Sequence, residues 1–89
     1  MEKMLKKNFF VLTYQKDSNT EESFIKTIWS THNQNQFALT NSIMDCKMYD
    51  EREEAIKAKN ELINDLQPDV KHTALIKIRT VAVVYYLYP

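Results

Sequence analysis

The spacing of apolar and polar side chains predicts a strand near the start of the chain. Residues 8–15, NFFVLTYQ, are rich in aromatic and β-branched residues, and Phe10, Leu12 and Tyr14 share one face of an extended segment. The polar residues 16–22 follow as a predicted loop. The first element is therefore a strand that ends in a turn.

Residues 23–31, SFIKTIWST, fit two patterns. Phe24 and Ile28 have helical spacing, but the composition is rich in β-branched and aromatic residues. The sequence HNQNQ that follows is typical of a hairpin turn leading into FALT. These features favour a strand pair, 23–31 with 36–41, and leave a helix over 23–31 as the alternative.

A helix is predicted over about residues 50–66, after a short strand or extended link at 43–49. Asp50 stands at the N-cap, and Glu53 three residues later completes a capping-box pattern. Pro68 ends the helix. The side chains at helical spacing, in which only the stem of a lysine interrupts the apolar stripe, are Ala55, Ile56, Lys59, Leu62, Ile63 and Leu66.

The last segment, 74–88, is a strand that changes character along its length. Up to residue 80 it alternates, with Lys77 and Arg79 on the face opposite the apolar side chains. From Val81 onward both faces are apolar. Such a strand begins with one polar, solvent-exposed face and ends with two apolar faces.

This strand is too long for a compact domain of this size. Fifteen extended residues span about 50 Å, whereas a compact chain of 89 residues is about 30 Å across. The strand must bend into the protein's own core, or its end must project as a dimer seam or a strand-addition site. Tyrosine enrichment favours an interface, for which the predicted residues are Val81, Val83, Val84, Tyr85, Tyr86, Leu87 and Tyr88.

Together the elements predict one α+β domain over residues 1–89. Their order is β-β-β-α-β, which indicates a single, mostly antiparallel sheet with the helix packed on one face. The content of 44% hydrophobic and 27% charged residues is ordinary for a globular protein. A chain this short has a marginal core, so a partner or a second copy would stabilise it.

Charge gives little support to nucleic-acid binding. Twelve basic and twelve acidic residues cancel. The one basic cluster, Lys3, Lys6 and Lys7, lies in residues 1–7, which are predicted to be a frayed terminus. A nucleic-acid-binding regulator stays the alternative function, and it would use these lysines with Arg79, Tyr85, Tyr86 and Tyr88.

No catalytic, cofactor or metal signature stands out. Cys46 with His32 or His72 lacks a linking motif, and a lone cysteine is commonly a small buried hydrophobe. The absence of glycine excludes a P-loop and a dinucleotide fingerprint. The acids Asp50, Glu51, Glu53 and Glu54 suit a helix N-terminus. We therefore predict a protein without enzymatic activity or cofactor.

The expected location is the cytoplasm. Residues 1–7 are not followed by the apolar run of a signal peptide, and the uncharged segment 80–89 is too short to cross a bilayer as a helix. Ten lysines against two arginines, with plentiful asparagine, isoleucine and tyrosine, indicate a low-GC genome.

Residues 46–62, CKMYDEREEAIKAKNEL, resemble a junction found in small phage and prophage proteins of low-GC Gram-positive bacteria. The resemblance rests on Tyr49, Asp50, Glu53, Glu54 and Ala55 and covers about a fifth of the chain. It implies a viral accessory protein, many of which occupy a surface on a host enzyme, as anti-CRISPR and other anti-defence inhibitors do. The prediction is a homodimeric inhibitor that binds a bacterial host protein by surface occlusion.

Overall fold

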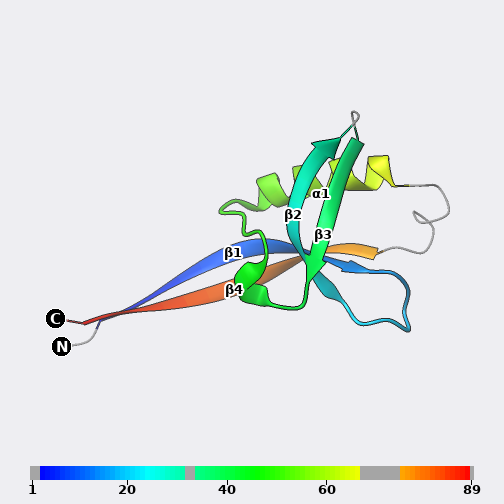
Figure 1. Ribbon diagram of the computed structural model, residues 1–89. Helices are drawn as coiled ribbons and strands as arrows, with labels where there is room; N and C mark the ends of the chain where they lie inside the picture. The colour runs from blue at the N-terminus through cyan, green and yellow to red at the C-terminus, as the bar shows by residue number, and fades with distance from the viewer. Residues whose placement is uncertain (1–2, 32–33, 67–74, 89) are drawn as a thin grey trace.

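The computed structural model describes residues 3–31, 34–66 and 75–88, which form one four-stranded antiparallel sheet and one α-helix (Figure 1). The sheet has the strand order β3-β2-β1-β4. This confirms the α+β class and the order β-β-β-α-β. The elements are β1 (Lys3–Gln15), β2 (Ser23–Thr31), β3 (Gln34–Thr40), a 3₁₀ turn (Ile43–Asp45), α1 (Arg52–Asp65) and β4 (Leu75–Leu87).

The sheet consists of two ribbons that meet over a short junction. β1 and β4 pair along their whole length, from Lys3 opposite Leu87 to Gln15 opposite Leu75. By contrast, β1 pairs with β2 only at Thr13 and Tyr14. The β2–β3 hairpin therefore rises steeply from the β1–β4 ribbon, and α1 lies behind it (Figure 1).

Beyond this junction the β1–β4 ribbon projects from the rest of the molecule as a two-stranded arm, residues 3–9 and 81–88 (Figure 1). The principal extents are 55 × 30 × 19 Å, and the radius of gyration is 15.3 Å. A compact chain of this length would have a radius of gyration of about 12 Å. The arm accounts for the excess.

The hydrophobic core lies between the sheet and α1, and it does not extend into the arm. Its buried members come from β1, β2, β4, α1 and the segment before the helix: Leu12, Ile25, Tyr49, Ala55, Leu62 and Ile76. Phe10 and Ile78 are the last half-buried residues of β1 and β4 packed against it on the arm side. Burial of a leucine or isoleucine side chain contributes about 1.5–3 kcal/mol. The described part of the molecule outside the arm, called the body below, is therefore stabilised independently of the arm's side chains.

The strand pair predicted at 23–31 and 36–41 is confirmed as β2 and β3, and the helical alternative is wrong. The segment 43–49 is a 3₁₀ turn followed by a single bridge between Tyr49 and Phe10, rather than a strand. Two backbone hydrogen bonds make this bridge, at 2.9 and 2.8 Å.

Residues 3–7 differ from the prediction of a frayed terminus. They are the first part of β1 and pair with residues 83–87. The prediction weighed only their local composition, whereas their partner strand lies at the other end of the chain. Residues 1–2 are outside the described part.

The helix begins two residues later than predicted, and Asp50 does not cap it. The N-cap is Glu51, in an extended conformation and without a side-chain capping hydrogen bond. The Asp50 carboxylate instead accepts a hydrogen bond from Lys7 Nζ at 3.0 Å. The capping-box prediction is therefore wrong, because a basic residue of β1 takes the carboxylate.

Candidate interaction surface on the projecting arm

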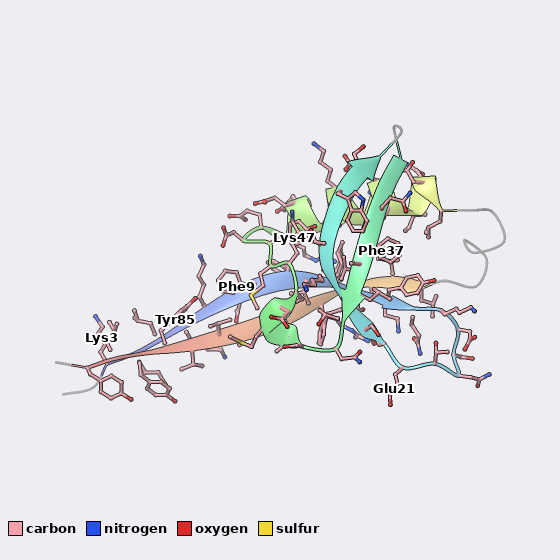
Figure 2. The ribbon with its side chains drawn as sticks, in the orientation of Figure 1. Lys3, Phe9, Glu21, Phe37, Lys47 and Tyr85 are labelled. Atoms are coloured by element: carbon pink, nitrogen blue, oxygen red, sulfur yellow. The ribbon has the colours of Figure 1, made fainter. Side chains whose placement is uncertain are left out.

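Each face of the arm combines side chains from both strands. Residues directly opposite each other in an antiparallel pair share a face. One face carries Tyr86 opposite Met4 and Val84 opposite Lys6. The other carries Leu87 opposite Lys3, Tyr85 opposite Leu5 and Val83 opposite Lys7. Figure 2 shows Lys3, Tyr85 and Phe9 in this order from the tip of the arm inward.

Large apolar side chains are exposed on both faces. Tyr88 is 70% exposed, Met4 63% and Tyr86 56%. The predicted residues Val81 and Val83 are half-buried, while the rest of the predicted set, Val84, Tyr85, Tyr86, Leu87 and Tyr88, is exposed. All seven lie on the arm, and the alternative that this segment bends into the protein's own core does not hold.

The interface predicted from the sequence did not include the residues that β1 adds to this surface. Met4 and Leu5, both exposed, lie beside Tyr86 and Tyr85. Residues 3–7 read Lys-Met-Leu-Lys-Lys and do not alternate between polar and apolar side chains. Their place in a strand follows from pairing with residues 83–87.

The outer edge of β4 has free backbone groups along the arm. Phe10 directs its N–H and C=O to Tyr49, away from β4, so Phe10 and Thr80 form a non-hydrogen-bonded pair. Such pairs alternate with hydrogen-bonded pairs in an antiparallel ladder. The N–H and C=O groups of Thr80, Ala82, Val84 and Tyr86 therefore point outward, and β4 has no further strand beside it among the described residues.

All charged side chains on the arm are positive. Lys3, Lys6 and Lys7 lie on its β1 strand, and residues 3–9 and 81–88 contain no acidic residue. Lys7 Nζ bonds to Asp50 at 3.0 Å and lies 4.8 Å from the centre of the Phe9 ring. Along the arm, β4 itself carries no charged side chain.

The body end of β4 is charged and held in place. Arg79 donates from Nε and Nη2 to the two carboxylate oxygens of Glu22, each at 2.8 Å, and Thr13 Oγ1 also donates to Glu22. These hydrogen bonds, from Arg79 first, lower the pKa of Glu22 from 4.5 to about 2. The network ties the loop before β2 to β1 and β4.

This network makes stability depend on pH in the acid range. The unfolded chain binds more protons between about pH 4.5 and 2, so the contribution of Glu22 is fully present above pH 4.5 and is lost as pH falls through about 2. We expect Glu22→Gln to cost about 1 kcal/mol at pH 7, with the difference from wild type shrinking toward pH 2. Urea unfolding at several pH values measures it.

The control for this prediction is Glu21→Gln, because Glu21 is an exposed neighbour that points away from the body (Figure 2). This variant should unfold like wild type at every pH. A Glu22→Gln difference that stays constant between pH 5 and 2 would contradict the assigned role of the carboxylate.

Cys46 directly follows the 3₁₀ turn and is not part of either arm strand. It is buried, its thiol donates to the Ile43 carbonyl at 2.9 Å, and burial raises the pKa of the thiol. A raised thiol pKa disfavours the nucleophilic thiolate. The predicted partners His32 and His72 lie outside the described residues.

The acidic side chains near α1 do not form a metal site. Asp50 pairs with Lys7, while Glu53 and Glu54 occupy the first turn of the helix. Within the described ranges, no group of three or more histidine, cysteine, aspartate or glutamate side chains is placed to hold a metal ion. The same part of the chain contains no helix with the length and apolar character needed to cross a membrane.

Comparison with protein-family models, with curated proteins and with solved structures finds no match to this chain.

Proposed function

We propose that the protein is a non-enzymatic interaction module and that the arm is its contact surface. The observation that carries this proposal is the cluster of exposed apolar side chains on a strand pair outside the core: Met4, Leu5, Val84, Tyr85, Tyr86, Leu87 and Tyr88. Exposed apolar patches beside an open strand edge are an aggregation hazard unless a partner covers them. Tyrosine suits such a surface because it combines an apolar ring with a polar tip.

The proposed biological role is inhibition of a bacterial host or defence protein by surface occlusion, in the bacterial cytoplasm. The resemblance of residues 46–62 to phage proteins supports this role. Homodimer formation through the C-terminal strand is part of the proposal. The burial of Cys46, which raises the pKa of its thiol, supports a role without covalent chemistry.

A paired capture experiment tests the arm. We expect immobilised wild-type protein to retain a protein from a low-GC Gram-positive lysate and the variant Tyr86→Glu/Leu87→Glu to lose at least nine-tenths of it. These side chains lie on opposite faces, and glutamate is chosen because Lys3 lies directly opposite Leu87. Leu75→Glu, on the exposed body end of β4, is the control and should retain the protein. Equal retention by all three would contradict the proposal.

A second candidate is nucleic-acid binding, which one observation favours. The structure brings Lys3, Lys6 and Lys7 onto the same arm as Tyr85 and Tyr86, and lysines beside aromatic side chains suit a single strand. Binding to single-stranded DNA that weakens steeply with salt would support this candidate. The absence of binding at low salt would exclude it.

A further inference from the structure

The outer edge of β4 loses its protection where the arm begins. Charged side chains discourage pairing at an open edge, and Lys77 and Arg79 supply such charges on the body end. From Thr80 to Tyr88 there is no charge and no proline. Residues 80–88 of this edge are thus uncharged and mostly apolar, and alternate residues direct their backbone N–H and C=O groups away from β1.

We infer that a second copy of this chain occupies this edge, with β4 of one copy pairing antiparallel to β4 of the other around Val84. This inference rests on the proposed function of the arm and specifies the strand edge and the register of the homodimer. The two ribbons join into one four-stranded sheet with the order β1-β4-β4-β1. A symmetric dimer of this kind uses the same patch on both copies.

The register follows from two independent features. The apolar stretch 81–87 overlaps its own copy fully only when residue 84 is opposite itself. The backbone N–H and C=O groups of Val84 also point outward from the edge of β4. The two Val84 residues therefore exchange N–H···O bonds across the two-fold axis of the dimer. The same register places the outward groups of Ala82 opposite those of Tyr86 in the second copy.

Side-chain pairing across the seam is favourable in this register. Tyr85 lies opposite Val83 of the second copy, and Leu87 lies opposite Val81. An aromatic side chain directly opposite a β-branched one, as Tyr85 is opposite Val83, is a favourable cross-strand pair. The bodies lie at opposite ends of the joined sheet, because Thr80 of one copy faces Tyr88 of the other.

The lysines select the β4 edge over the β1 edge. In the proposed dimer the two β1 strands are three strand spacings apart, about 14 Å, which exceeds the screening length of about 8 Å at physiological salt. Pairing through the outer edge of β1 would instead place Lys3, Lys6 and Lys7 of two copies on adjacent strands. Like charges directly opposite each other are destabilising.

Cysteine substitutions in the full chain, with Cys46→Ser as background, test the register. Val84→Cys should form an intermolecular disulfide with itself, because a hydrogen-bonded pair has a Cα separation of about 5.5 Å. Ala82→Cys alone and Tyr86→Cys alone should not, because each residue is four positions from its own copy, but a mixture of the two should. Self-linking by Ala82→Cys, or no linking by Val84→Cys, would overturn the register.

Proline substitutions at one cross-strand pair show whether the dimer forms through the edge of β4 or the edge of β1. Asn8 and Ala82 lie directly opposite each other, and the N–H of each points outward. Light scattering of the wild type should give twice the monomer mass of 10.6 kDa. Ala82→Pro should weaken dimerisation at least about tenfold by removing an outward donor, whereas Asn8→Pro should leave it unchanged.

A wild-type mass of one copy at high concentration would overturn the inference, as would a dimer weakened by Asn8→Pro and not by Ala82→Pro. Neither result bears on the capture experiment with Tyr86→Glu/Leu87→Glu. The role of the arm as the contact surface for a bacterial protein and its pairing with a second copy therefore fail separately.

Discussion

Replacing Leu12 with alanine is expected to lower the free energy of unfolding by about 3 kcal/mol. Leu12 is 1% exposed and packs in the core beneath α1. Truncation of a buried leucine removes its transfer free energy and leaves a cavity, at a cost of about 2–5 kcal/mol. A domain of this size has a total stability of about 5–13 kcal/mol, so the variant is expected to lose roughly a quarter to three-fifths of it.

The matched control is Leu5→Ala on the same strand. Leu5 is 45% exposed on the arm, and its truncation should cost less than about 0.5 kcal/mol. Urea unfolding followed by circular dichroism, at a concentration where the protein is monomeric, measures both variants. Equal losses would contradict the division of β1 into a core segment and an arm.

Local patterns predicted the elements well where neighbouring residues carry the signal. The β-branched and aromatic composition of 23–31 indicated a strand, and β2 spans those residues. The apolar stripe of the helix placed Ala55 and Leu62 in the core, and both are buried. The last strand was placed within one residue at each end.

Pairing between distant segments was beyond such patterns. Lys3–Lys7 carries a weak strand signal by itself, and it is ordered by residues 83–87. Asp50 has the right type and spacing for an N-cap, but Lys7 lies within reach of its carboxylate. In both cases a contact between residues far apart in the sequence determines the local structure.

The candidate surface was predicted in part. An over-long strand with two apolar faces has to project or bend, and its length and apolar pattern predict residues 81–88 as the segment that does so. This pattern gave no information on the second strand of the arm, which adds Met4, Leu5 and three lysines to the surface. Because all three lysines lie on β1, the β1 strand of the arm is positively charged and the β4 strand is uncharged.

Amide hydrogen exchange, resolved by residue, tests most directly that the arm is the contact surface. In the free monomer, the outward N–H groups of Thr80, Ala82, Val84 and Tyr86 should exchange fast, while those of Val81, Val83 and Tyr85, which point toward β1, should exchange slowly. The comparison is with the arm occupied by a second copy at high concentration or by the captured bacterial protein. We expect exchange at the four outward amides to slow at least tenfold, so that the alternation disappears. Slowing confined to α1 or the β2–β3 hairpin, with the arm amides unchanged, would contradict the assignment.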